Sequence, residues 1–298
     1  MIQIPKDADI LPPSDDHIFK TLLTHPNAKP VLMNLISSVI ERTVVDVLVR
    51  NTELPAAAAD EKAVRLDVNC VIDGGDQVNV EMQASHMEEN SDGHSNFRNK
   101  YVYYLAYLHA SQKSKGLKYR DLARSYQITF CTYTIFPEWP HFATHATLST
   151  PDGRQISDQM NMAIIELSKL KEALEKPVEE LTPLELWSLF FKFAPNPKHR
   201  GFVNKIISQK EEIAMATELL MEISQDERER ALFMSRKKYE TDMTSNLLTA
   251  EARGEARGVA IGEARGRFEV ARNMKLLGID LSTIVNTTGL TVEEVLNM

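Results

Sequence analysis

Two carboxylates and one amide occupy neighbouring segments in which polar and apolar residues alternate. Asp67 lies in Arg-Leu-Asp-Val-Asn-Cys, and Glu81 and Gln83 lie in Val-Asn-Val-Glu-Met-Gln. The turn sequence Asp73-Gly74-Gly75-Asp76 separates them, which is typical of a β-hairpin. Carboxylates gathered on one face of such a hairpin would bind a hard cation, Mg²⁺ or Mn²⁺. Gln83, on the same face, would orient a water molecule or a phosphate without adding charge.

The length of the turn decides whether the two carboxylates meet. A two-residue turn at 74–75 would mix the polar and apolar faces, whereas a three-residue loop over 73–75 keeps the faces separate and places Asp67 opposite Glu81. Opposed residues share a face, with Cβ atoms about 5 Å apart. We therefore expect the three-residue loop and a cation that offsets the repulsion. The alternative is a pair of solvated charges on an exposed face. The expected apolar face comprises Leu66, Val68, Cys70, Ile72, Val78, Val80 and Met82.

The surrounding pattern predicts an α/β half of about 150 residues followed by an all-α half. Ser14 is the expected N-cap of the first helix, with Asp15 and Asp16 in its first turn. Further helices are expected at 29–42, 96–113, 160–174, 184–193 and 203–223, and further strands at 44–49, 126–136 and 141–149.

The C-terminal part contains a four-residue repeat with glycine at 254, 258, 262 and 266. A stripe of small residues permits helices to approach closely, so we expect a homo-oligomer formed through this helical tail. The alternative is a frayed helical linker. The predicted organisation is an extended arm (1–13), an α/β core (14–150), a helical region (151–234), the glycine-repeat tail (235–267) and a small helix-turn-helix-like end (268–298).

Several of these motifs together resemble a known family. Asp67 followed by Glu81-Met82-Gln83 resembles the split Asp…Glu-x-Gln signature of the recombination-promoting nuclease and transposase family, within the PD-(D/E)XK nuclease superfamily. Asp16-His-Ile-Phe19-Lys20 is similar to the family's Asp-x-x-Phe-Lys helix. Phe97-Arg98 and Tyr101–Tyr104 are similar to its Tyr-rich helix. With the glycine repeat and the closing helix pair, the resemblance spans most of the chain.

The resemblance implies a restriction-endonuclease-like core, with a mixed sheet flanked by helices. It also implies metal-dependent DNA endonuclease activity linked to recombination or mobile elements. By position, Asp67 and Glu81 would hold the metal, with the Met82 carbonyl as a further ligand. Gln83 stands where the superfamily more often has lysine. Asp16 would be the acid from the first helix, with Asp15 as the alternative, and whether one or two metals bind is left open.

Charge gives independent support for DNA as a partner. The chain has 34 Lys+Arg and 42 Asp+Glu, a formal net charge of −8. The segment 94–124 nevertheless carries seven Lys and Arg and one acid, Asp121. Such charge supplies most nonspecific affinity for DNA, although an ordinary basic helix face is the alternative. The DNA-contact candidates are Arg98, Lys100, Lys113 and Lys115, with Arg98 expected to lie closest to the carboxylates.

Other features narrow the functional class. No apolar stretch is long enough to span a membrane, and no secretory signal is evident, so we expect a cytoplasmic, bacterial-type location that includes the nucleoid. The chain has no Walker-type loop, so ATP use is not expected. Cys70 and Cys131 are expected to be buried thiols, and Trp139 and Trp187 core residues. The competing hypotheses are a catalytically silent DNA-binding or oligomeric assembly protein on the same fold, and a helical interaction protein.

Overall fold

The computed structural model describes residues 2–50, 53–54, 64–84, 91–112 and 118–298. It divides into two compact units, Met1–Phe233 and Met234–Met298. No helix in these ranges is both long and apolar enough to cross a membrane.

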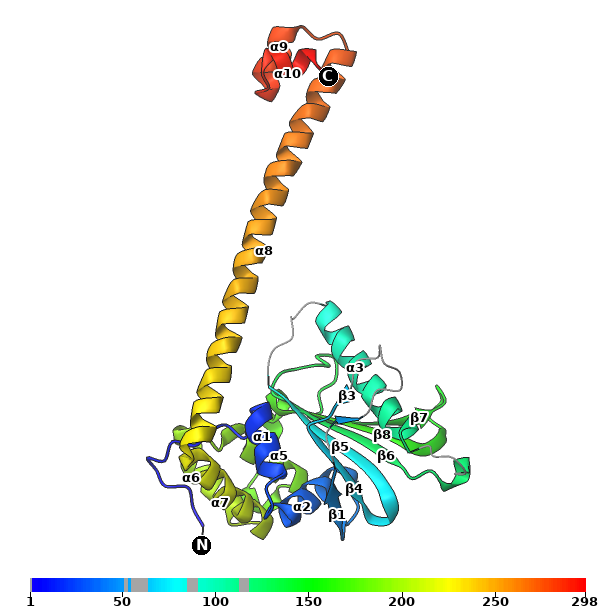
Figure 1. The fold of residues 1–298 in the computed structure, drawn as a ribbon, viewed down its shortest axis with the longest axis vertical. Coiled ribbons are helices and arrows are strands. Elements are labelled where there is room, and N and C mark those ends of the chain that lie inside the picture. Colours follow the sequence, from blue (N-terminus) through cyan, green and yellow to red (C-terminus); the bar gives the residue numbers. More distant parts are fainter. Residues whose placement is uncertain (1, 51–52, 55–63, 85–90, 113–117) are drawn as a thin grey trace. The chain divides into compact units, whose positions relative to one another are not determined.

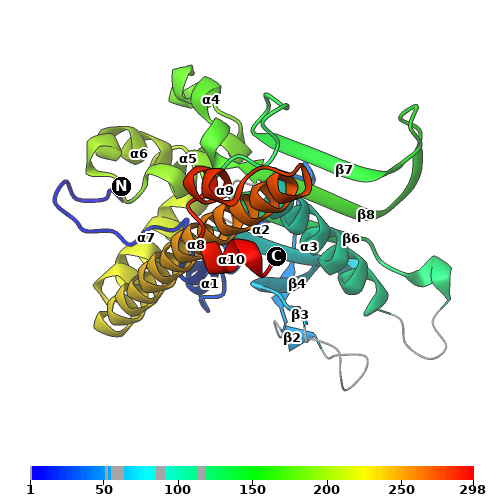
Figure 2. The same ribbon diagram turned by 90° about the horizontal axis from the view of Figure 1, so that it is seen from above.

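A six-stranded mixed sheet, ordered β1-β4-β5-β6-β8-β7, forms the centre of the first unit (Figure 1). β5, β6 and β8 run parallel, and the remaining pairs are antiparallel. β7 and β8 form a long hairpin at one edge (Figure 2). The strands are β1 (Val47–Val49), β4 (Val68–Ile72), β5 (Asp76–Gln83), β6 (Ser125–Cys131), β7 (Ala143–Ser149) and β8 (Gln155–Glu166). β2 (Glu53–Leu54) and β3 (Val64–Arg65) pair separately.

Helices cover both faces of the sheet, which confirms the predicted fold class. The main core packs several helices against one face, and a second cluster of buried residues packs α3 against the other (Figure 1). The helices on the first face are α1 (Asp16–Leu23), α2 (Lys29–Ile40), α5 (Pro183–Phe193), α6 (Arg200–Ile207) and α7 (Glu211–Gln225). α3 spans Ser91–Ala110, and the short α4 spans Lys171–Glu175.

The hairpin of β4 and β5 has the predicted three-residue connection. Residues 73–75 form a single 3₁₀ turn, and Ile72 pairs with Asp76. Gly74 has φ +66°, a left-handed conformation that glycine adopts without steric cost. The register therefore agrees with the one expected from alternation and turn length.

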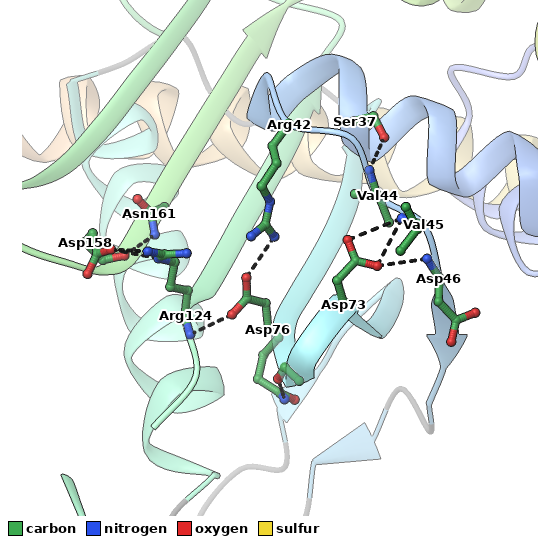
Figure 3. Close-up of polar contacts among 12 residues, drawn as sticks. Ser37, Arg42, Val44, Val45, Asp46, Asp73, Asp76, Arg124, Asp158 and Asn161 are labelled. Atoms are coloured by element: carbon green, nitrogen blue, oxygen red, sulfur yellow. Dashed lines mark hydrogen bonds and ion pairs between the residues drawn. The ribbon is translucent and has the colours of Figure 1, made fainter. Parts of the chain in front are cut away.

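Polar contacts fix the turn end of this hairpin (Figure 3). Asp73 accepts hydrogen bonds from the backbone N–H groups of Val45 and Asp46, at 3.0 and 2.8 Å. Asp76 accepts from Arg42 Nη2 at 2.8 Å and from the backbone N–H of Arg124 at 3.1 Å. The two aspartates thus tie the turn to the segment between α2 and β1 and to the residue that precedes β6.

The helix predicted at 160–174 is wrong. Residues 155–166 form β8, which pairs in parallel with β6, and α4 follows it. Ala163, Ile164 and Ile165 are buried on both faces of the sheet, and such a continuous apolar run does not distinguish a strand from a helix. The sheet consequently extends beyond Pro151. The helix predicted at 203–223 is divided into α6 and α7.

The second unit contains most of α8 (Glu227–Leu276), followed by α9 (Leu281–Thr288) and α10 (Val292–Leu296). Gly278 and Gly289 have φ +75° and +69° and follow the ends of α8 and α9. A small apolar cluster joins the three helices through Ala271, Ile284, Leu290 and Val295. The four repeat glycines lie within α8, where an added Cβ would meet no atom within 4 Å.

Candidate active site

The polar face of the β4–β5 hairpin lies on the α3 side of the sheet and is buried. Asn79, Glu81, Gln127 and Thr129 are each at most 3% exposed. Asn79 Nδ2 donates to Glu81 Oε1 at 2.8 Å and to Gln127 Oε1 at 2.9 Å. Gln127 Nε2 donates to Thr129 Oγ1 at 3.1 Å. Glu81 is therefore held by a side-chain network rather than solvated on an exposed face.

Asp67 lies where β4 begins. Val68 pairs with Val80, so the same register, extended by one residue, places Asp67 opposite Glu81. The predicted strand over 63–72 is interrupted here, because residues 66 and 67 lie outside the ladder. Leu66 consequently leaves the expected apolar face and packs against Leu108 of α3.

The environment of Asp67 opposes its ionisation. Burial, followed by the charges of Glu81 and Asp16, raises the pKa of Asp67 to about 7, against an ordinary value of 3.8. Lys100 and Lys20 act in the opposite direction and do not cancel the effect. Three carboxylates thus interact at one end of the sheet, and two lysines lie within electrostatic reach.

Glu81 has a cation beside it. Lys100 Nζ, from α3, lies 3.7 Å from Glu81 Oε2, and Glu81 is 3% exposed. Burial raises the pKa of Glu81, although Lys100 and the hydrogen bonds from Asn79 and Tyr101 oppose the rise. A buried carboxylate with an incompletely compensated charge is the kind of group that a bound cation stabilises.

Gln83 ends β5 on the same face. Tyr101 Oη donates to Gln83 Oε1 at 3.0 Å, and Lys100 Nζ donates to Tyr101 Oη at 3.4 Å. The Tyr101 contact fixes the oxygen end of the amide, which leaves the NH₂ end of Gln83 to donate to a ligand.

The N-terminus of α1 supplies the third acid. Asp15, not Ser14, is the N-cap: its side chain accepts hydrogen bonds from the backbone N–H groups of His17 and Ile18. Asp16 is the first residue of the helix, and its charge acts on Asp67. Of the two alternatives, Asp16 is therefore the acid with an electrostatic link to Asp67.

The donor set fits a hard divalent cation. Asp67 and Glu81 offer carboxylate oxygens in a buried setting. Burial raises the pKa of both groups, and at Asp67 the charge of Glu81 adds to the rise despite the nearby lysines. Within the described ranges, no group of three or more His, Cys, Asp or Glu side chains is placed to hold a metal. Any further ligands would therefore be other oxygens, such as a backbone carbonyl, water or the substrate.

The basic segment does not form one uniform face. Lys100 lies beside Glu81, whereas Arg98 lies 3.8 Å from Glu138 and over the ring of Phe136. Arg124 pairs with Asp158 at 2.5 Å. Lys113 and Lys115 lie outside the described residues. Among the basic residues of this segment that the structure describes, Lys100 rather than Arg98 is thus the one that contacts a site carboxylate.

Sequence reasoning missed the partners that surround the carboxylates. Asn79, Gln127 and Thr129 were not singled out, and Lys20 and Tyr101 entered only through the family resemblance. The available signal was the alternation in Tyr-Gln-Ile-Thr-Phe, which marks Gln127 and Thr129 as one face of β6. The two cysteines are buried, as predicted. Trp187 is also buried, but Trp139 is 42% exposed, so its predicted place in the core is wrong.

Comparison with known proteins identified the family of this chain. A protein-family model described as PD-(D/E)XK nuclease family transposase matches residues 13–250, a range that includes every site residue described above. No curated protein and no solved structure showed a significant match.

Proposed function

The chain belongs to the PD-(D/E)XK nuclease family transposases, and on this premise we propose that it is a metal-dependent DNA endonuclease that acts in recombination or in mobile-element movement. The observation that carries the proposal is the electrostatic interaction of Asp67 with Glu81, two carboxylates at the end of a sheet beside Lys100. Such an arrangement is costly for the fold alone and is useful where a cation is bound.

Asp67 and Glu81 would hold the cation, Mg²⁺ or Mn²⁺, because hard carboxylate oxygens suit these ions. The Met82 carbonyl is proposed as a further ligand. When bound, the cation supplies Lewis acidity and lowers the pKa of a coordinated water. Asn79, through its hydrogen bond to Glu81 Oε1, would keep the glutamate in the orientation that binding requires.

Lys100 would stabilise the negative charge that develops on the scissile phosphate. The superfamily more often has lysine at the position of Gln83, and here the ammonium group at the site comes from α3 instead. Gln83, oriented by Tyr101, would donate its NH₂ group to the attacking water or to a phosphate oxygen. Asp16, whose charge acts on Asp67, would add negative charge to the site, which strengthens cation binding.

DNA contacts would come from the basic residues near the site. Arg98 shares an exposed ion pair with Glu138, and such pairs contribute little to stability, so a phosphate can replace Glu138 at small cost. Lys100 would reach the same strand, and Lys113 and Lys115 would extend the contacts. Cleavage of chromosomal or mobile-element DNA would require a cytoplasmic location, which stays a prediction.

Plasmid cleavage during a Mg²⁺ titration tests the proposal. We expect nicking that depends on Mg²⁺ or Mn²⁺ and stops in EDTA, and that falls by orders of magnitude in Asp67→Asn and in Glu81→Gln, because a metal's share of transition-state stabilisation is several kcal/mol. Asp242→Asn, an exposed change of the same charge on α8, is the matched control and should cleave normally.

The second candidate is a catalytically silent DNA-binding or assembly protein on the same fold. It is favoured by the absence, within the described residues, of a group of three or more His, Cys, Asp or Glu side chains placed to hold a metal. Retention of wild-type cleavage by Asp67→Asn in a clean preparation would refute the endonuclease proposal. DNA binding without metal-dependent cleavage would favour the silent alternative.

We also propose that the tail associates with a second copy of the chain. α8 exposes Tyr239, Met243 and Leu247 at four-residue spacing, each more than half exposed. Helices gain most of their stability by burying an apolar face, and a second α8 would provide the surface on which to bury it.

A further inference from the structure

Trp139 ends a turn that follows β6, in which its backbone N–H donates to Phe136 O at 3.0 Å. Its indole stacks on Phe136, with ring centroids 4.1 Å apart and an interplanar angle of 17°. The guanidinium carbon of Arg98 lies 4.5 Å from the centroid of the same Phe136 ring. Phe136 is 7% exposed, whereas Trp139 is 42% exposed. The Phe136 ring is therefore covered by its neighbours, whereas part of the Trp139 side chain is accessible to solvent.

A buried ion pair holds the turn in place. Glu166 is fully buried, and its Oε1 accepts hydrogen bonds from the backbone N–H groups of Ile135 and Phe136 at 2.6 and 3.1 Å. Lys169 Nζ pairs with Glu166 Oε2 at 2.7 Å and donates to the carbonyl oxygens of Phe136 and Trp139. Removing two charges from water costs free energy. Here the buried Glu166–Lys169 pair holds the backbone of the turn whose Trp139 side chain is partly exposed.

The turn lies at the same end of the sheet as the carboxylates. Thr132 donates through its backbone N–H to Gln83 O at 3.1 Å and through Oγ1 to Ala84 O at 3.0 Å, so the segment starts against the residues that end β5. Phe136 follows Thr132 by four positions, which span at most about 14 Å, the length of about four nucleotides of a strand within a duplex at 3.4 Å each. Trp139 stacks on Phe136 and so lies near the same point.

We infer that Trp139 stacks on an unpaired nucleobase of the DNA strand that occupies the site, with Arg98 contacting a nearby phosphate. This inference rests on the proposed nuclease function. A base inside a duplex has both faces covered by its neighbours, so an indole can stack only on an unpaired or terminal base. The substrate preferred at this site is consequently DNA with unpaired nucleotides close to the cut, rather than intact duplex.

Tryptophan fluorescence of the full-length protein tests the inference without cleavage. The chain has two tryptophans, and Trp187 is fully buried, so quenching by added DNA reports on Trp139. The probes are a single-stranded oligodeoxynucleotide of about 16 nucleotides and its blunt duplex, both in EDTA. We expect the single strand to quench the emission more strongly than the duplex, and Trp139→Phe to abolish the quenching.

Affinity gives the second readout. Stacking of one base predicts that Trp139→Ala weakens single-strand binding about 5- to 150-fold and lowers the ratio of single-strand to duplex affinity. Trp139→Phe, which keeps a ring, should largely preserve both. Equal quenching by both probes, or equal weakening of both affinities in Trp139→Ala, would overturn the inference.

The cleavage assay separates this inference from the function on which it rests. Plasmid cleavage by the wild-type protein without selective quenching would refute the stacking role alone. Selective quenching without metal-dependent cleavage would refute the nuclease alone and leave a protein that binds unpaired DNA.

Discussion

Lys100 of α3 places its ammonium nitrogen 3.7 Å from Oε2 of Glu81 on β5, although 19 positions separate the two residues in the chain. The contact brings a positive charge to the buried carboxylate of Glu81. Gln83, on the same strand, carries no charge. It also lowers the pKa values of both Glu81 and Asp67, so Lys100 influences the protonation state of the pair as well as its total charge.

Replacement of Lys100 should therefore change both the rate and the pH profile. We expect Lys100→Gln to reduce cleavage about 100-fold, the usual effect of removing one group that stabilises transition-state charge. Because the lysine lowers both carboxyl pKa values, its loss should move the acidic limb of the pH–rate profile to higher pH. Lys118→Gln, at an exposed position, is the control. A reduced rate with an unmoved acidic limb would contradict the electrostatic role.

The raised pKa of Asp67 makes the stability of the metal-free protein depend on pH. The folded state retains a proton up to about pH 7 that the unfolded chain releases near 3.8. The free energy of unfolding should therefore fall as the pH rises from about 4 to 7. In EDTA at about pH 8, Asp67→Asn should melt at a higher temperature than wild type, and the difference should vanish near pH 4. Thermal melts across this range check the prediction.

Added Mg²⁺ should reverse the order of these melting temperatures. A cation that binds the folded state stabilises it by mass action, so the melting temperature of the wild-type protein should rise near pH 8, while that of Asp67→Asn changes little. A similar rise in Asp67→Asn would place the cation elsewhere.

The hairpin turn provides a test of backbone conformation. Gly74 has φ +66°, and a Cβ in this region costs about 1–2 kcal/mol, so Gly74→Ala should lower the free energy of unfolding by that amount. Gly201, in α6, has open space around its would-be Cβ and ordinary φ. Gly201→Ala should therefore be neutral or stabilise the protein by up to about 1 kcal/mol. Denaturant unfolding of the two variants should give changes of opposite sign or, at the least, clearly different size.

Substitution of the four repeat glycines tests whether α8 associates with a second copy of the chain or serves only as a linker. Replacing all four glycines with alanine should increase the helicity of α8, because each glycine costs about 1 kcal/mol relative to alanine and open space surrounds each one. If the glycine stripe is where two copies approach closely, the added methyl groups should weaken their association. The average molar mass measured by light scattering should then fall towards that of one chain. Greater helicity with an unchanged mass would mean that the stripe does not mediate association.

The hairpin register could be predicted because its determinants are local. Alternation over a few residues fixes which face each side chain occupies, and the turn length fixes which residues oppose each other. Asp67 and Glu81 follow from these two facts without reference to the rest of the chain. Even here, the break in the strand at Leu66 was not visible, because it depends on packing against Leu108 of α3.

The remaining features depend on contacts between distant segments. A helix was predicted for the residues of β8 because a continuous apolar run does not distinguish a strand buried on both faces from a helix. Parallel pairing with β6 makes this segment a strand. Trp139 was expected in the core on the basis of residue type. Its exposure results from the turn that Glu166 and Lys169 hold from another part of the chain. The position of Lys100 at Glu81 likewise depends on how α3 lies across the sheet.

The two ends of β5 would respond in opposite ways to laboratory evolution. At the turn end, Asp76 is matched by Arg42 and by the backbone of Arg124, so most substitutions there would be lost in a screen for thermal stability. At the other end, replacing Asp67 relieves electrostatic conflict, and the same screen would enrich it. A library selected for heat resistance alone should therefore drift towards inactive proteins with an intact fold. Positions that such a selection enriches while cleavage disappears would mark the extent of the catalytic centre.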